Sequence, residues 1–284
     1  MNQIRLVTML LAITIICASQ PTTAQHSAVQ QNPAYLPVAQ ANLPWWTPDI
    51  HDKLQIQFTD VPIDQSIAAD VYDVDMFDTT ADLVASLHSA GYRVLCYINV
   101  GAWEDWRPDK ADFLPSVLGK DYAGWPGERW LDIRQIDVLG PIMQARFDLC
   151  KAKGFDGVEP DNTNGYLNDT GFNLTYQDQI IYNTWLAAEA HRRGLAIGLK
   201  NDTEQANDLV SVFDFSVTEG CLAEGWCADA SVFVENAKPV FAIEYTDMMT
   251  AQQFLTTFCR QARALQLNAV LKHRNLDAWS QYCP

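Results

Sequence analysis

A repeated unit of helix, glycine and strand is the strongest hydrophobic pattern along the chain. The helix ends at 88–91, 151–154 and 191–194 lead into the strand-like runs 93–100, 157–162 and 196–201. Each helix end closes with a glycine, as a helix C-terminus with a left-handed residue requires. The runs that follow are short and carry Val, Ile or Leu. They predict strands buried on both faces of a parallel sheet.

Helices are predicted between these strands. Leu83, Val84 and Leu87 share one face of a helix over 80–90. A second helix is predicted over 141–153. A third, over 175–193, opens with Thr175 and Asp178 in the spacing of a capping box.

Six further runs are strand candidates, which makes nine in all. They cover 54–58, 71–77, 130–133, 213–219, 240–245 and 269–273. Strand and helix alternate over about 230 residues without a change of composition, which favours a single (β/α)8 TIM barrel of the α/β class over an open sheet. Periodicity alone does not separate the two. An eight-stranded barrel has no place for a ninth strand, so we expect 54–58 or 71–77 to pair at the barrel edge or to lie in an N-terminal extension.

The N-terminal residues predict export. Arg5 precedes an apolar run over 6–18, and small residues follow up to Ala24, which is the pattern of a signal peptide over 1–24. A retained N-terminal anchor is the alternative, although the run is shorter than the about 20 residues of a membrane span. Residues 25–44, rich in Gln, Ala and Pro, predict a flexible lead-in. We therefore expect a secreted monomer, or a periplasmic or cell-surface protein, folded over 45–284 and without membrane contact after cleavage.

The cysteines agree with export. Of seven, six remain once Cys17 is removed with the signal peptide. Cys221 with Cys227 would close a short loop, and Cys259 with Cys283 would tie the last helix to the tail. The other two, Cys96 and Cys150, form either a third bridge or two buried free thiols. No CxxC spacing occurs and the histidines are scattered, so we expect no metal site.

The composition and the missing motifs exclude several classes of partner and cofactor. The 284 residues carry a net charge of −16 with 48% hydrophobic residues, which predicts a folded acidic protein. This charge argues against nucleic acid as a partner and suits a cationic or neutral one. GxSxG, HExxH, GxGxxG and GxxxxGK motifs are all missing from the sequence, so we expect no cofactor.

Polar residues end most of the predicted strands, and a parallel barrel brings these ends to one mouth. They are Tyr97, Asn99, Asp132, Glu159, Asp161, Lys200, Asn201, Asp202, Glu219, Glu244, Lys272 and His273. Helix capping explains Asp202 and Asn162, but not two strands that end in Glu. Carboxylates on opposite sides of a pocket suit cleavage of a glycosidic bond. We expect two or three of the nine tryptophans to line a sugar-binding groove.

Seven segments in unbroken order resemble glycoside hydrolase family 114, over residues 44–284. They are VYDVDMFDT (71–79), YRVLCYINVGAWEDWRPD (92–109), GWPGERWLDIR (124–134), GFDGVEPDNTNGY (154–166), IGLKND (197–202), VTEGC (217–221) and KPVFAIEY (238–245). The resemblance implies a secreted endo-α-1,4-polygalactosaminidase on a TIM barrel. Its substrate would be a cationic or partly acetylated polysaccharide that contains galactosamine.

The same resemblance implies the catalytic pair. Asp161 matches the nucleophile and Glu219 the general acid/base of a retaining mechanism, which needs carboxyl groups about 5–5.5 Å apart rather than about 6.5–9.5 Å. Glu159, two residues before Asp161 on the same side of its strand, is the alternative nucleophile or else a partner of Lys200.

Further strand-end residues are candidate substrate contacts. Glu244 and Asp75 would bind the ammonium groups of galactosamine. The others are Tyr97, Glu159, Lys200, Asn162, Asp202 and Tyr245. Two other functions remain open, a catalytically inert carbohydrate-binding barrel and a glycosidase for a different α-linked galactosaminide.

Overall fold

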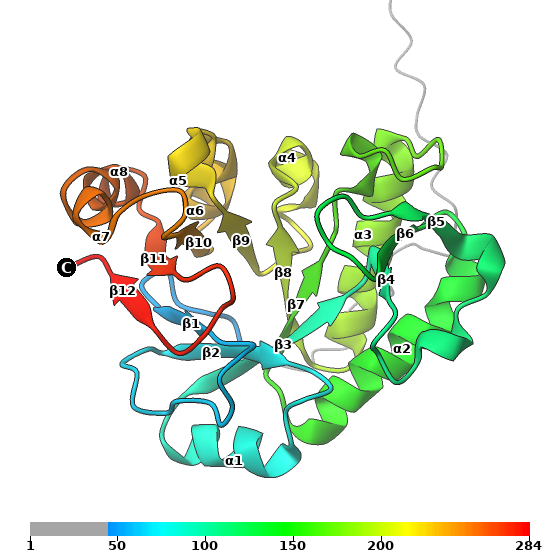
Figure 1. Ribbon diagram of the computed structural model, residues 1–284, viewed down its shortest axis with the longest axis horizontal. Helices are drawn as coiled ribbons and strands as arrows, with labels where there is room; N and C mark the ends of the chain where they lie inside the picture. Colours follow the sequence, from blue (N-terminus) through cyan, green and yellow to red (C-terminus); the bar gives the residue numbers. More distant parts are fainter. Residues whose placement is uncertain (1–44) are drawn as a thin grey trace, which may run out of the picture.

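Eight parallel strands form the barrel of this α/β protein (Figure 1), whose computed structural model describes residues 45–284. In spatial order they are β1 (Leu54–Ile56), β2 (Val71–Asp75), β3 (Arg93–Asn99), β7 (Gly157–Asp161), β8 (Ala196–Lys200), β9 (Phe215–Glu219), β10 (Val240–Tyr245) and β11 (Asn268–Lys272). A short strand, β12 (Ser280–Tyr282), pairs antiparallel with β11. The predicted signal peptide and lead-in lie outside the described residues.

The seam between the first and last parallel strands is joined by individual hydrogen bonds. The Asn268 side chain donates to the Ile50 carbonyl at 2.9 Å, and the Phe58 amide donates to the Leu276 carbonyl at 2.8 Å. Lys272 Nζ donates to Gln55 Oε1 at 3.2 Å. These bonds bring the two sides of the seam together, and the predicted TIM barrel is confirmed.

The extra strand is not where the sequence pattern placed it. Both 54–58 and 71–77 supply barrel strands, whereas 130–133 overlaps β6 (Glu128–Leu131) of a separate antiparallel sheet. This small sheet has the order β4-β6-β5, with β4 (Ala102–Glu104) and β5 (Leu118–Asp121), and Figure 1 shows it in green to one side of the barrel strands. A parallel neighbour of β3 would need a long crossover, usually a helix. Residues 100–127, all described, hold only the 3₁₀ turns η2 (Lys110–Asp112) and η3 (Pro115–Val117) as helical structure.

The three predicted helices are confirmed. They are α1 (Ala81–Ser89), α2 (Ile136–Lys153) and α3 (Tyr176–Arg192), and α2 begins earlier than expected and continues through Pro141. The capping box of Thr175 and Asp178 is present. The remaining helical segments are η4 (Gly165–Leu167), η5 (Thr203–Gln205), α4 (Ala206–Leu209), α5 (Cys221–Glu224), η6 (Cys227–Ala230), α6 (Ser231–Glu235), α7 (Ala251–Gln253), the π-helical η7 (Phe254–Phe258) and α8 (Cys259–Ala264).

The apolar core has two layers. One fills the barrel interior, where Phe215, Phe241 and Ile243 are buried. The other lies between the sheet and the surrounding helices and includes Phe147 and Leu186. The interior leaves so little room at Gly198 that an added Cβ would come within 2.3 Å of the Phe215 ring. Apolar packing therefore fills the barrel below its mouth, which keeps the polar strand ends at one rim.

Three disulfides lie in or against the outer apolar layer. Cys221–Cys227 and Cys259–Cys283 form as expected. Cys96–Cys150 is the third bridge and ties β3 to α2, so the alternative of two free thiols is wrong. Over the part of the chain that the structure describes, no helix has both the length and the apolar character to cross a membrane.

Candidate active site

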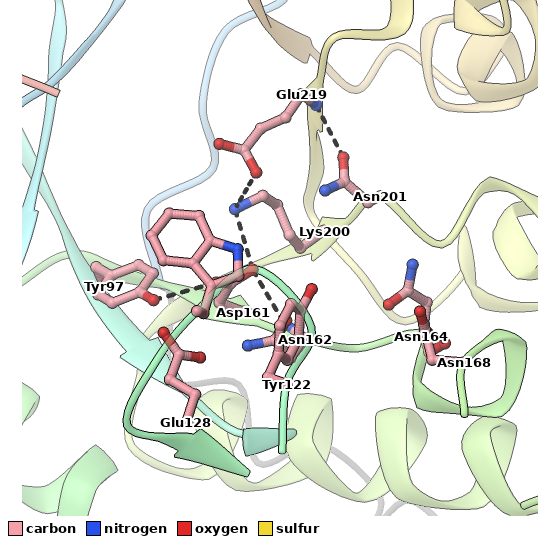
Figure 2. Close-up of a pocket in the computed structure, with 11 residues that line it drawn as sticks. Tyr97, Tyr122, Glu128, Asp161, Asn162, Asn164, Asn168, Lys200, Asn201 and Glu219 are labelled. Carbon is pink, nitrogen blue, oxygen red and sulfur yellow. Dashed lines mark hydrogen bonds and ion pairs between the residues drawn. The ribbon is translucent and has the colours of Figure 1, made fainter. Parts of the chain in front are cut away.

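A polar cavity opens at the carboxyl ends of the barrel strands (Figure 2). Its walls come from β3, β7, β8 and β9, from the loops that follow them, and from the small sheet. The lining residues are Tyr97, Tyr122, Trp125, Glu128, Asp161, Asn162, Asn164, Asn168, Lys200, Asn201 and Glu219. Of the polar strand ends that were expected to meet at one mouth, five line this cavity, namely Tyr97, Asp161, Lys200, Asn201 and Glu219.

Two carboxylates in this cavity share one cation. Asp161 ends β7 and Glu219 ends β9, while Lys200 ends β8 between them. Lys200 Nζ lies 3.1 Å from Asp161 Oδ1 and 3.3 Å from Glu219 Oε2. Figure 2 shows the lysine reaching between the two acids. The two carboxylate oxygens are therefore no farther apart than the sum of these distances.

Asp161 is held by three donors. Tyr97 donates its hydroxyl to Oδ2 at 3.1 Å, and the Asn162 amide donates to Oδ1 at 2.9 Å, beside the lysine. After this amide the chain turns sharply, because Asn162 has a left-handed backbone with φ of 64°. Gly101 allows this turn, since a Cβ there would lie 1.8 Å from the Asn162 carbonyl oxygen.

Glu219 is oriented from two sides. The Tyr245 hydroxyl donates to Oε1, and the Glu219 amide donates to Asn201 Oδ1 at 2.8 Å. The guanidinium carbon of Arg274 lies 3.6 Å from the centre of the Tyr245 ring. The side chain of Glu219 keeps partial exposure to the cavity, where a bound molecule can reach it.

Glu159 lies beneath this pair and holds the lysine from inside the barrel. Its Oε1 is 2.8 Å from Lys200 Nζ, and its side chain is fully buried. Burial raises the pKa of Glu159 to about 7, against the lowering effect of Lys200. Burial alone would lower the pKa of Lys200, but Asp161, Glu159 and Glu219 outweigh it and raise that pKa well above its usual value. The lysine therefore stays charged among three acids.

Comparisons with known proteins decide the family. The model of glycoside-hydrolase family GH114 matches residues 36–284. This chain belongs to glycoside hydrolase family 114. It is similar to Ega3 of Aspergillus fumigatus, whose structure was solved in complex with galactosamine, with 38% identity, a TM-score of 0.80, and coverage of 84% of this chain and 98% of that one.

A second solved structure shares the fold of this family 114 enzyme. It is the glycoside hydrolase domain of PelA from Pseudomonas aeruginosa, with 12% identity, a TM-score of 0.64, and coverage of 81% of this chain and 98% of that domain. At this identity the likeness shows the barrel alone. A search of curated proteins found no match.

Five predicted contact residues of this glycoside hydrolase lie outside the cavity lining. Glu159, described above, is one of them. Glu244 is buried and accepts the amides of Leu222 and Ala223 at 2.7 and 3.2 Å, and burial raises its pKa to about 7. Asp75 pairs with Arg107 at 2.7 Å. The oxygens expected to bind ammonium are thus already occupied by other groups.

The other two contribute indirectly. Asp202 accepts bonds from Tyr166 at 3.2 Å and Asn183 at 3.1 Å, and burial raises its pKa to about 8. Tyr245 contacts Glu219, as described above. Asp132 does not reach the cavity either, since it follows β6 of the small sheet and pairs with Arg134 at 2.7 Å.

Sequence reasoning missed part of the lining. Glu128 comes from β6, Tyr122 directly follows β5, and Asn164 and Asn168 come from the segment after β7. Trp125 lines the cavity, whereas two or three tryptophans were expected. The available signal was the Gly-Trp-Pro-Gly segment over 124–127, a turn-forming sequence that exposes an aromatic residue.

Potential metal ligands within residues 45–284 do not converge in this cavity. Among the described residues, one group of potential ligands converges, namely Cys221, Cys227 and Glu244. The two sulfurs are joined in a disulfide, so neither is available as a thiolate. Glu244 meanwhile accepts two backbone amides. This cluster therefore supports the polypeptide around α5 and does not form a metal site.

Proposed function

We propose that this glycoside hydrolase is a secreted, endo-acting enzyme that cleaves α-1,4-linked galactosamine polymers with retention of configuration. The single observation that carries the proposal is the convergence of Asp161 and Glu219 on Lys200 in one cavity. The similarity to Ega3, which was solved with galactosamine, supports the choice of sugar.

The geometry supports a two-step reaction. Asp161, fixed by three donors, attacks the anomeric carbon, while Glu219 protonates the departing glycosidic oxygen. In the second step Glu219 accepts a proton from water, which releases the sugar from Asp161. One oxygen of each acid contacts the same ammonium, at 3.1 and 3.3 Å, so the two carboxylates approach each other closely. This close approach supports the proposal of retention, which needs a shorter separation of the carboxyl groups than inversion does.

The surrounding groups position the pair. Lys200 anchors both acids, and Glu159 anchors the lysine from below. Because Glu159 is fully buried and does not line the cavity, we assign it this positioning role and assign the nucleophile to Asp161. Tyr97 and Tyr245 hold one carboxylate each.

Export is part of the proposal. Three disulfides in the described part of the chain suit an oxidising compartment. The segment over 1–24 has the composition of a signal peptide.

The test is cleavage of a deacetylated α-1,4-galactosamine polymer by the purified protein and its variants. Asp161→Asn and Glu219→Gln should each lower kcat by about 10³-fold or more, because each removes a group that acts in the transition state, with an unchanged melting temperature. Glu159→Gln should retain more activity than Asp161→Asn. The reverse order would make Glu159 the nucleophile, and normal turnover by both Asp161→Asn and Glu219→Gln would refute the catalytic pair.

A glycosidase for another α-linked galactosaminide is the second candidate. The same assay on the fully acetylated polymer separates it from the first. Faster cleavage of the acetylated polymer would favour the second candidate, since an acetylated unit carries no ammonium for the acidic cavity to bind.

A further inference from the structure

Glu128 is an acid of the cavity that the proposed reaction does not use. It is the first residue of β6, lines the cavity, and is only 8% exposed. Its carboxylate receives one long hydrogen bond, 3.4 Å from Asn99 Nδ2. Within residues 45–284, no Lys, Arg or His nitrogen lies within ion-pair distance of it. A buried carboxylate in such a position is costly unless a cation compensates it.

The strand register of the small sheet raises the free-energy cost of ionising Glu128 further. Glu128 stands directly opposite Glu104 in the register of β4 and β6, and like charges in that arrangement repel. Arg107, the cation that lowers the pKa of Glu128, pairs instead with Glu104 at 2.8 Å and with Asp75 at 2.7 Å. Burial, then Glu104 and Asp161, raise the pKa of Glu128 to about 8. Stability alone does not explain an acid at this position.

Glu128 shares its cavity with aromatic side chains. Figure 2 shows its carboxyl group directed toward the side of the cavity that holds Tyr97 and Asp161. Trp125, about half exposed, lines the same cavity from the turn before β6, and Tyr122 lines it from the end of β5. Aromatic faces of this kind pack against the apolar surfaces of a sugar ring.

We propose that Glu128 binds the ammonium group of a galactosamine unit and thereby makes the cavity select deacetylated over N-acetylated units. This inference rests on the proposed function and assigns its specificity to one residue. An ammonium beside Glu128 favours the ionised carboxylate, which releases its proton to solvent and accepts from the three ammonium donors, whereas an N-acetyl amide is neutral and supplies one donor. Glu244 and Asp75, the acids expected to do this, are occupied by backbone amides and by Arg107.

Binding by an inactive enzyme tests the inference without turnover. Titration calorimetry on Asp161→Asn would compare a galactosamine oligosaccharide with its N-acetylated counterpart of equal length. Adding Glu128→Gln, which keeps the shape and the acceptor for Asn99, should weaken binding of the amine form by about 10- to 100-fold. Binding of the acetylated form should stay within about twofold. Equal weakening of both ligands, or of neither, would overturn the inference.

Asp121→Asn is the matched control. Asp121 ends β5 of the same small sheet, and its side chain is 94% exposed. This substitution removes one negative charge without changing the cavity, so it should leave both affinities unchanged. If it weakened amine binding as strongly as Glu128→Gln, general attraction by the acidic protein would explain the preference and the inference would fail.

Failure of the proposed function would give a different result. In that case the wild-type protein would cleave none of the galactosamine polymers, while the binding titrations would still show whether Glu128 discriminates the amine. A protein that cleaves the polymer but binds both oligosaccharides alike in the two backgrounds would keep its function and lose this inference.

Discussion

The barrel mouth and the small sheet treat buried acids in opposite ways. At the ends of β7, β8 and β9, the acids Glu159, Asp161 and Glu219 surround Lys200, which compensates their charge. In the small sheet, Glu104 and Glu128 face each other, and the available arginine contacts only the first. Both regions line or support the same cavity.

We infer from this difference that the barrel acids carry out catalysis and that the small sheet selects the substrate. Catalysis needs its carboxylates fixed before the substrate arrives, so their partners are built into neighbouring barrel strands. Selection of a cationic sugar benefits from an acid whose partner is the substrate itself. The small sheet, inserted between β3 and α2, can carry that acid without disturbing the barrel.

Removing Lys200 would leave the acids at the barrel mouth without a counter-charge, as Glu128 is in the small sheet. Lys200→Met should lower kcat by roughly 10²-fold or more, because both acids lose their common anchor. It should also lower the free energy of unfolding by about 3–5 kcal/mol, since buried acids are left without a counter-charge. Kinetics and denaturant unfolding measure both effects. A fully stable, active variant would show that the lysine does not organise the site.

Two of the disulfides differ in the length of chain that they close. Cys96–Cys150 closes a 54-residue separation that contains the small sheet, whereas Cys221–Cys227 spans six residues. Loop-closure entropy predicts losses of about 4 and about 2 kcal/mol when each pair is changed to alanine. Denaturant unfolding of the two double variants would measure this, and a larger loss for the short loop would contradict the ordering.

The pH dependence of stability would isolate the uncompensated acid. Folded Glu128 keeps its proton up to a pKa of about 8, whereas an unfolded chain releases it near 4.5. Between these values the folded state binds more protons, so the free energy of unfolding falls as pH rises. Glu128→Gln removes this loss. Because the group faces an open cavity and solvent screens its charge, we discount the full shift to an effect of roughly 1–2 kcal/mol, which should raise Tm by about 5 °C at pH 8 relative to wild type, with little change at pH 4.5. A Tm difference that is the same at both pH values would contradict an ionising Glu128.

The same two regions differ in how far the sequence could predict them. The barrel follows from the helix–glycine–strand repeat, and its polar strand ends follow from the parallel topology, so Asp161, Lys200 and Glu219 were expected to meet. A short apolar run such as 130–133 looks the same in a parallel and an antiparallel sheet. Its misplacement also moved Asp132 into the expected site and kept Glu128 out of it.

Some contacts have no sequence signal at all. Glu244 ends a barrel strand like Glu219, yet its carboxylate turns to the amides at the start of α5. Asp75 likewise ends its strand, but Arg107, which lies far along the chain, occupies it. Strand periodicity gives the side of the sheet on which a residue lies, and only the folded loops decide which partner it meets.

The most direct test of the catalytic proposal is the configuration of the first product. Proton NMR during cleavage of the α-1,4-galactosamine polymer distinguishes α from β reducing ends before they interconvert. Attack by Asp161 with Glu219 as acid and base predicts the α-anomer first, and no product above background from Asp161→Asn. Initial β-anomer, or wild-type rates from that variant, would contradict the account.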